Sequence, residues 1–380
     1  MNPYLLPTLA ALLTCPALAP ALDLPALTLA DTPAFRAATA PTLPAVRLTL
    51  YWENDTGFAK PFGSQDRHYT AGAGAALALR APAIDTFLRT LPSFFNEFNG
   101  PDTRTALGIV GALTIFTPED IGNSNAIPDD RPYAGWTYAG FFFQRAHPGT
   151  DPKHAQLYNL APLLSPSSYA AYESLELDLG LVGPSSLAQN AQEMIHHAYD
   201  FIDPRGWNNQ INDEPEFSLK YNRRWRSPTL LLTDFGLMAD AIPELGITAG
   251  SLIDDVHAGA TFRIGEYFPR DFGPGELSNP ADFTSTSSDF TRPCSFYFFG
   301  RPCARLVAHN TLLQGDNFSS RDPVTVNPEP AVFSVQAGLV VRLFNCLELA
   351  YMTTWESPEF DRQHAWDSWS SLQLGFSWTF

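Results

Sequence analysis

Apolar and polar residues alternate one by one in several long stretches of this sequence. The clearest stretches are 46–53 (VRLTLYWE), 175–181 (LELDLGL) and 371–380 (SLQLGFSWTF). Successive side chains of a β-strand point to opposite faces, so each stretch predicts a strand with one apolar and one polar face. Two folds provide such surroundings: a soluble sandwich of two sheets, and a barrel that separates lipid from a polar lumen.

Twelve segments of the chain fit this strand pattern. They are 46–55, 68–79, 103–116, 131–146, 173–182, 214–226, 229–249, 253–266, 296–310, 331–344, 347–357 and 368–380. An even number of strands brings both ends of a closed bacterial barrel to the same side of the membrane. The stretches 268–294 and 315–330, which contain Pro and Gly, are predicted to be extracellular or periplasmic loops. Because the sequence has neither a repeat nor a linker, we expect residues 46–380 to form one domain.

Three further features favour a membrane barrel. Residues 1–21 combine an apolar stretch with small terminal residues, which is typical of a signal peptide, and an Ala- and Pro-rich leader follows at 22–45. The sequence ends on an aromatic strand, as those of outer-membrane barrels commonly do. Aromatic residues also gather near predicted strand ends, where we expect girdles at the membrane interface. The examples are Trp136, Tyr138, Trp366 and Trp369. We therefore predict an all-β, antiparallel transmembrane barrel, monomeric and integral to a bacterial outer membrane.

The charge balance bears on the partners of the chain. With 40 acidic and 23 basic residues, the net charge is −17. Binding to nucleic acid requires a basic surface, so nucleic acid is excluded as the main partner. The acidic balance suits divalent cations and equally suits mere solubility. Cys294 and Cys303 are near in sequence, and a disulfide between them is one possibility in an exported protein.

One segment interrupts the series of strands. Residues 185–201 (SSLAQNAQEMIHHAYDF) lack Gly and Pro and favour a helix, with Ser185 or Ser186 as its N-cap. The helix would lie between the fifth and sixth strands, over the mouth or the wall of the barrel.

Several ordered motifs carry a resemblance to a known family. They are END at 53–55, DRHYTAG at 66–72, TPED at 117–120, DRPYAGW at 130–136, GLVGP at 180–184, QEMIH at 192–196, GWNNQ at 206–210 and EP at 214–215. In this order they resemble the lipid A 3′-O-deacylases, hydrolases of the outer membrane. The resemblance spans residues 46 to about 266 and is weaker beyond.

The resemblance implies a twelve-stranded barrel that removes the acyloxyacyl chain from the 3′ position of lipid A, the membrane anchor of lipopolysaccharide. It also implies dependence on Ca²⁺, contact with outer-membrane lipids, and an active site on the barrel wall near the membrane. Carried over residue by residue, the family's catalytic set falls on Asn54, Asp55, Thr70, Gln192 and His196.

The chemistry of these residues agrees with ester hydrolysis. His196 is the best candidate for the general base, because an imidazole titrates near neutral pH. Gln192 lies four residues earlier, on the same face of the predicted helix, and could orient the ring or the water. Asp55, Asn54 and Thr70 offer oxygen ligands of the kind that Ca²⁺ prefers, and the ion would polarise the ester carbonyl.

Simpler explanations exist for the same residues. Asn54 and Asp55 could form a turn, Thr70 could be an ordinary strand residue, and Asp66-Arg67 and Asp130-Arg131 are interpreted as structural pairs inside the lumen. Some family members carry a supporting Glu six residues after the His. Here that position is Ile202, and Asp200, Asp203 and Glu214 are possible substitutes.

Two other functions compete with the deacylase. An outer-membrane phospholipase A is also a calcium-using barrel, but its His-x-Ser-Asn-Gly motif does not occur in this sequence. A non-catalytic barrel, either a pore or a degenerate relative of the enzymes, is the alternative. Single-channel conductance distinguishes a pore from the deacylase, because a deacylase barrel of this size is expected to have a lumen filled by side chains.

Overall fold

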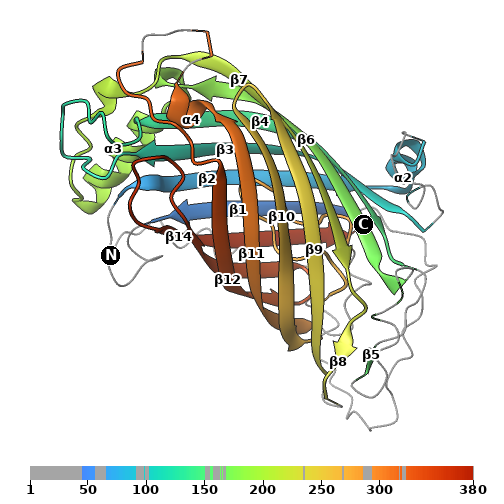
Figure 1. The fold of residues 1–380 in the computed structure, drawn as a ribbon. Helices are drawn as coiled ribbons and strands as arrows, with labels where there is room; N and C mark the ends of the chain where they lie inside the picture. The colour runs from blue at the N-terminus through green and yellow to red at the C-terminus, as the bar shows by residue number, and fades with distance from the viewer. Residues whose placement is uncertain are drawn as a thin grey trace.

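The computed structural model describes residues 45–55, 66–90, 98, 102–149, 155–156, 163, 165, 168–233, 236–267, 269–285, 293–315, 317–318 and 322–379. The predicted signal peptide and nearly all of the predicted leader lie outside these residues. Twelve long strands form one closed antiparallel barrel (Figure 1). The ring closes where the first strand pairs with the last, in a register that sets Ala45 opposite Thr379.

The barrel strands correspond one by one to the predicted segments. They are β1 (Ala45–Asn54), β2 (His68–Arg80), β3 (Arg104–Thr117), β4 (Ala134–His147), β6 (Ala170–Val182), β7 (Glu214–Arg226), β9 (Leu237–Gly250), β10 (Ile253–Glu266), β11 (Cys294–Asn310), β12 (Ala331–Leu343), β13 (Leu347–Glu356) and β14 (Asp367–Thr379). Only the strand predicted at 229–249 begins clearly later. Its first residues form the short β8 (Leu230–Leu231), which turns back and pairs with the start of β9. β8 also pairs with the short β5 (Ala155–Gln156).

The two faces of the barrel differ as the alternation predicts. On β1, Leu50 and Trp52 are exposed, whereas Thr49, Tyr51 and Glu53 are buried. The same pattern holds on β6, where Leu175, Leu177, Leu179 and Leu181 are exposed and their neighbours Glu176 and Asp178 are buried. A barrel with an apolar outer surface suits lipid surroundings. None of the described helices is long and apolar enough to cross a membrane.

The inner face of the barrel is lined by paired charges. Ion pairs join neighbouring or facing strands, and nearly all of these side chains are buried. They include Arg145 with Glu173 (2.5 Å), Lys220 with Asp178 (2.6 Å), Arg224 with Glu244 (3.0 Å) and Arg47 with Glu348 (2.8 Å). Buried charges are tolerated when they are paired in this way.

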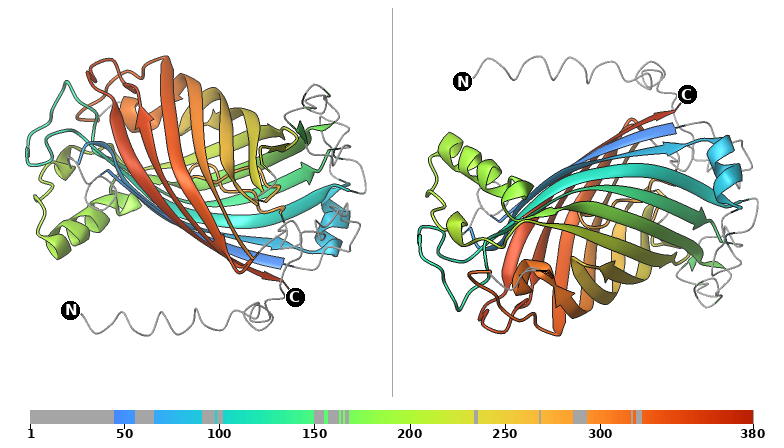
Figure 2. Two further views of the ribbon diagram at one scale, coloured as in Figure 1. Left: turned by 90° about the horizontal axis from the view of Figure 1, so that it is seen from below. Right: turned by 90° about the horizontal axis from the view of Figure 1, so that it is seen from above.

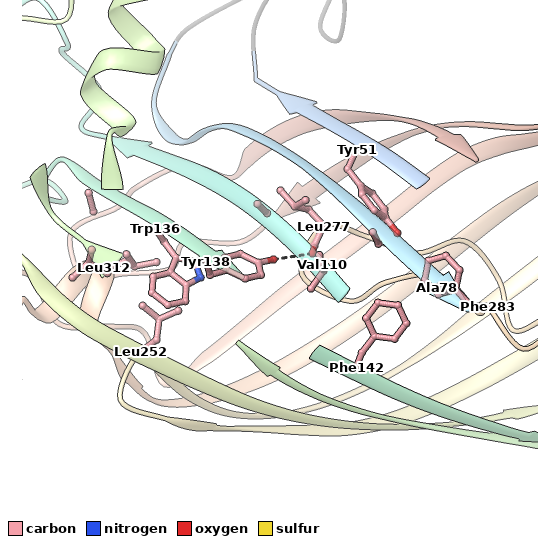
Figure 3. Close-up of a cluster of buried hydrophobic side chains, with 14 of the residues drawn as sticks. Tyr51, Ala78, Val110, Trp136, Tyr138, Phe142, Leu252, Leu277, Phe283 and Leu312 are labelled. Atoms are coloured by element: carbon pink, nitrogen blue, oxygen red, sulfur yellow. Dashed lines mark hydrogen bonds between the residues drawn. The ribbon is translucent and has the colours of Figure 1, made fainter. Parts of the chain in front are cut away.

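Residues 269–285, called the plug segment below, lie inside the barrel. Its apolar residues Leu277 and Phe283 pack among strand side chains (Figure 3), and Tyr138 donates a hydrogen bond to the Leu277 carbonyl (3.1 Å). Other bonds to its backbone come from Gln144 (3.1 Å), Gln373 (2.6 Å) and Arg224 (3.1 Å). The prediction that 268–294 is a loop outside the barrel is therefore wrong for this part. Twelve strands enclose more space than their side chains fill, and the segment occupies it.

Three of the four predicted girdle aromatics face inward. Trp136 and Tyr138 are buried, stack on each other with ring centres 5.4 Å apart, and belong to the interior cluster (Figure 3). Trp369 packs on Tyr69 and lines the cavity of the lumen. Only Trp366 is exposed. The prediction of an interface girdle is wrong for the other three, because aromatic side chains also fill the space beside the plug segment.

The predicted possibility of a disulfide between Cys294 and Cys303 is wrong. Both are free thiols. They lie nine positions apart on the single strand β11, so about 30 Å of extended chain separates them. A disulfide requires Cα atoms within about 7 Å of each other.

Short helices occupy the two ends of the barrel. α3 (Ala188–Tyr199) lies between β6 and β7, as predicted, at the same end as α4 (Thr311–Gln314), whereas α2 (Pro82–Leu88) lies at the opposite end (Figures 1 and 2). The predicted cap is shifted by one residue: Leu187 caps α3 in a left-handed conformation. Ser186 still accepts a hydrogen bond from the Ala188 amide (3.3 Å), because a 3₁₀ turn at Pro184–Ser186 precedes the helix.

Candidate functional site

The helix α3 is anchored to the barrel wall where the strands end. Ala188 packs in one buried cluster with Ala71 of β2 and Ile115 of β3. Tyr133 and Trp207 complete the cluster, with ring centres 4.9 Å apart. The two aromatics are thus packing residues, and the cluster fixes the face that α3 turns toward the wall.

A cleft of about 390 Å³ lies between α3 and the strands beside it. Four of the five predicted catalytic residues line it: Asn54, Thr70, Gln192 and His196. The other lining residues are Trp52, Asp66, Ala71, Ile115, Ile195, Tyr199, Phe201, Tyr351, Ser370, Ser371 and Leu372. Trp52 and Tyr351 are outward-facing residues of β1 and β13, so the cleft opens on the outer, lipid-facing side of the wall.

Asp55 lies just behind the cleft and is fully buried. Its Oδ2 accepts a hydrogen bond from the Arg67 amide (2.8 Å), and its own amide donates to the Thr70 carbonyl (3.1 Å). These bonds join the end of β1 to the start of β2. The predicted turn role of Asp55 is compatible with this geometry, and so is a role as a ligand at the base of the cleft.

Thr70 is the extra residue of a β-bulge. The pairing of β2 with β3 shifts between Tyr69 and Ala71, which leaves Thr70 unpaired. It is therefore not an ordinary strand residue. Its hydroxyl lies 2.8 Å from that of Thr117 at the end of β3. Bulges often redirect a side chain next to an active site.

Both ring nitrogens of His196 have partners. Nδ1 lies 2.5 Å from the Ile202 carbonyl, and Nε2 lies 3.0 Å from Oδ2 of Asp66. The ring is buried and packs edge-on against Phe201. Burial lowers the pKa of His196, but the hydrogen bonds to Asp66 and to the Ile202 carbonyl outweigh it and raise the pKa overall. Two acceptors facing one imidazole favour the charged ring.

Gln192 lies one helical turn before His196 on the buried face of α3, as predicted. Its Oε1 accepts a hydrogen bond from the indole nitrogen of Trp207 (2.8 Å). Because an indole N–H only donates, this contact fixes which end of the amide is which. The amide nitrogen of Gln192 is buried and has no hydrogen-bond partner among the described residues. The cleft thus has an oriented donor in its wall.

The charges around the cleft suit a cation. No Lys or Arg belongs to the lining residues, while Asp66 does and Asp55 lies behind it. Asn54 and Thr70 add neutral oxygens, so the donors are of the kind that Ca²⁺ prefers. Within the described ranges, no group of three or more His, Cys, Asp or Glu side chains forms a ready metal site. A bound ion would need backbone or water oxygens as well.

Two residues with clear contacts to the predicted set were not assigned to the site from the sequence. Asp66 was interpreted as a partner of Arg67, yet it contacts His196, and Arg67 pairs with Glu119 (2.9 Å). Trp207 packs in the cluster beside α3 and also orients Gln192. Their signal in the sequence was that both belong to motifs of the resemblance, Asp66 to DRHYTAG at 66–72 and Trp207 to GWNNQ at 206–210.

The proposed substitutes for the supporting Glu do not reach His196. Asp203 pairs with the exposed His197 (3.5 Å), Glu214 accepts a bond from the Asn317 amide (2.8 Å), and Asp200 ends α3. The Ile202 backbone carbonyl takes the place at Nδ1 instead. Asp130 and Arg131 are structural, as interpreted, although their side chains do not pair with each other. The Asp130 carboxylate accepts from the Glu119 amide (2.7 Å), and Arg131 pairs with Glu359 (3.1 Å).

A closed barrel with an apolar outside, a charged inside that holds the plug segment, and a polar cleft on its outer wall defines an integral membrane barrel whose cleft faces the lipid side. A family model described as outer membrane protein LpxR matches residues 22–380, so the chain belongs to this family. It is therefore an integral protein of the bacterial outer membrane.

One solved structure supports the fold. LpxR from Salmonella typhimurium has a TM-score of 0.62 and 17% identity, over 87% of this chain and 99% of that one. The β domain of the Bordetella autotransporter BrkA has a TM-score of 0.40 and 10% identity, over 89% of this chain and 99% of that one. No curated protein sequence matches the chain.

Proposed function

We propose that this protein is a lipid A deacylase that removes the 3′-linked acyloxyacyl chain by attack of water on the ester, assisted by Ca²⁺. The observation that carries the proposal is the convergence of His196, Gln192, Asn54 and Thr70 on one cleft at the outer wall. Apolar side chains beside them, including Trp52 and Leu372, suit the acyl chains of a lipid. We further propose that the protein acts as a monomer.

His196 supplies the general base in this proposal. The cleft offers no serine or cysteine in hydrogen-bond contact with the imidazole among the described residues, which favours water as the nucleophile. The Nδ1 contact with the Ile202 carbonyl holds the ring, because Nδ1–H must donate to a carbonyl (2.5 Å). Nε2, on the opposite side of the ring, is then the atom that takes the proton of the water.

Gln192 supplies a donor for the oxygen that becomes negative. Its amide oxygen is occupied by Trp207, so its NH₂ group is available to the ester carbonyl. A donor held in place before the reaction stabilises the oxyanion without further reorganisation. The loss of one such donor typically lowers kcat by about 10²–10³-fold.

Bound Ca²⁺ would supply the positive charge that the lining residues lack. Asn54, Thr70 and Asp55 would hold it through oxygen atoms. When bound, the ion would polarise the ester carbonyl as a Lewis acid. Asp55 would bind the ion only from its buried position behind the lining, where its carboxylate also joins β1 to β2.

The test is hydrolysis of lipid A by the purified barrel, followed by mass spectrometry. We expect loss of one acyloxyacyl group in Ca²⁺, no loss in EGTA, and recovery when Ca²⁺ is returned. His196→Ala and Asp55→Ala should each abolish turnover, whereas His197→Ala should not. His197 is the matched control, because it is the next residue of α3 and its side chain is 73% exposed. An unchanged lipid A mass with wild-type protein in Ca²⁺ would refute the proposal.

A further inference from the structure

His196 has an acceptor at each ring nitrogen, which raises the question of how it can act as a base. Nδ1 must donate to the Ile202 carbonyl, so in the neutral ring Nε2 carries a lone pair. Opposite that lone pair lies the Asp66 carboxylate, 3.0 Å away and also an acceptor. Two acceptors at this distance attract each other only through a proton. With the carboxylate ionised, this contact is the one expected of the charged imidazolium, the state that follows proton abstraction.

We propose that Asp66 is the positioning residue of His196, and that its carboxylate stabilises the imidazolium formed when the ring takes a proton from the attacking water. This inference rests on the proposed function and extends it to a residue outside the predicted set. It also gives the chain a carboxylate partner for its base, although Ile202 stands where some relatives have a supporting Glu.

The reaction step can be written with its atoms balanced. On the neutral ring, Nε2 and the Asp66 carboxylate are both acceptors, so one water on the cleft side can donate to both. The O–H bond toward Nε2 breaks as the water oxygen bonds to the ester carbonyl carbon, and the pair becomes imidazolium and carboxylate. Nε2–H then returns its proton to the sugar oxygen as the ester C–O bond breaks. Asp66 stays ionised throughout, as the orienting carboxylate of a catalytic triad does.

A purely structural ion pair is the competing explanation. Asp66 precedes β2 and His196 belongs to α3, so the contact could serve only to attach the helix. Burial argues for more than attachment, since the two side chains are 9% and 4% exposed. One helix position further, His197 and Asp203 form a comparable pair at 3.5 Å, but they are 73% and 56% exposed. An exposed pair contributes little, so it serves as a matched control.

Other ionisable groups near the ring are few. Asp203 lies beyond α3 and acts on His196 through its charge, as Asp66 does. Tyr199 of α3 and Tyr351 of β13 also line the cleft. No lining residue is a Lys or Arg. A change in the titration of His196 after substitution of Asp66 can therefore be compared directly with the effect of substituting Asp203.

The experiment compares Asp66→Asn, Asp66→Glu and Asp203→Asn with the wild type in detergent. Lipid A hydrolysis gives kcat and KM, and NMR of histidine-labelled protein follows His196, assigned with His196→Gln. Asp66→Asn should lower kcat by about 10²–10³-fold with little change in KM. It should also lower the His196 pKa and shift the acid limb of kcat/KM to lower pH. Asp66→Glu should recover part of the activity, and Asp203→Asn should stay within about threefold of the wild type.

The outcomes separate the two proposals. A barrel of Asp66→Asn that migrates as folded, with kcat within about threefold of the wild type, overturns the inference. So does an unshifted His196 titration, or an equal loss in Asp203→Asn. If wild-type protein does not hydrolyse lipid A, the proposed function fails. The NMR titration then still decides whether Asp66 stabilises the charged ring, because it needs no substrate.

Discussion

Replacing Trp207 by Phe should reveal how much the orientation of Gln192 contributes to turnover. The indole nitrogen donates to Oε1 of Gln192 at 2.8 Å. Phenylalanine keeps an aromatic ring against Tyr133, which lies 4.9 Å from the indole between ring centres. The substitution therefore removes one hydrogen bond and leaves most of the packing in the cluster. Gln192 can then turn its amide over, so that the oxygen and not the NH₂ group faces the substrate.

The size of the effect follows from the bond that is lost. A hydrogen bond of this kind contributes about 1 kcal/mol net, and a buried acceptor left without a partner costs about 1–3 kcal/mol. At about 1.4 kcal/mol per factor of ten, loss of the orientation should lower kcat about 5- to 140-fold. Complete removal of the donor in Gln192→Ala should cost more, about 10²–10³-fold. KM should change little in either variant.

The assay is the initial rate of lipid A hydrolysis in the two single variants and in the double variant. If Trp207 acts through Gln192, the double variant should be no slower than Gln192→Ala alone, because the orienting bond has nothing left to orient. Multiplied losses in the double variant would contradict the reasoning. They would show that Trp207 affects turnover through the packing of α3 or by another route.

Three further outcomes test other parts of the structure. Asp271→Ala should lower the free energy of unfolding by about 3–5 kcal/mol and give the barrel a measurable conductance in planar bilayers. The reason is that Asp271 of the plug segment pairs with Arg263 and Arg342 inside the lumen. Equal behaviour of Asp271→Ala and an exposed-site control, Asp102→Ala, would contradict this. Ile202→Ala should leave kcat and its pH dependence unchanged, since His196 contacts only the backbone carbonyl of Ile202, and a loss beyond about threefold would show that the side chain matters. The raised pKa of His196 means that its contact with Asp66 stabilises the fold fully below pH 6.5, the ordinary pKa of histidine, and less as pH rises through the raised pKa. The difference in melting temperature between wild type and Asp66→Asn should therefore shrink from about pH 5 to about pH 9. A constant difference would refute this prediction.

The barrel could be predicted from the sequence because alternation acts at short range. A period of two becomes visible within about seven residues, and a face toward lipid imposes it over much of each strand. The strands β7 and β10 were predicted at their observed bounds, and the other long strands except β9 lie within a few residues of theirs. The strand predicted at 229–249 failed where a short hairpin carries apolar residues of its own, because Leu230 and Leu231 fit a strand equally well in either direction.

The contents of the lumen could not be predicted in the same way. The alternation predicts that a side chain faces inward, but it does not predict which residues that side chain packs against. Trp136 and Tyr138 were placed at the membrane interface because aromatic residues near strand ends usually lie there. They lie inside because the plug segment enters the barrel, and that segment reads as an ordinary Pro- and Gly-containing loop. Its contacts come from residues up to 235 positions away in sequence, such as the bond from Arg47 to the Asp282 carbonyl.

The site was predictable as a set of residues but not as a network. The ordered motifs indicate Asn54, Thr70, Gln192 and His196, and these do meet. The contact of His196 with Asp66 spans 130 positions and depends on how α3 docks, which no local pattern encodes. The position of the family's supporting Glu was therefore the wrong place to search for a carboxylate.

The location of the cleft connects the alternation to the proposed chemistry. Asn54 shares the outward face of Leu50 and Trp52, four and two residues earlier on β1, but it lies at the end of the strand, beside the polar groups of α3. At that level a polar side chain on the outer face no longer meets hydrocarbon, so its burial against lipid costs little. The proposed function requires this end of the strand to lie at the level of lipid esters, between head groups and acyl chains. A substrate would then reach His196 laterally from the membrane without entering the barrel, so a lumen occupied by charges and by the plug segment is compatible with the proposed enzyme.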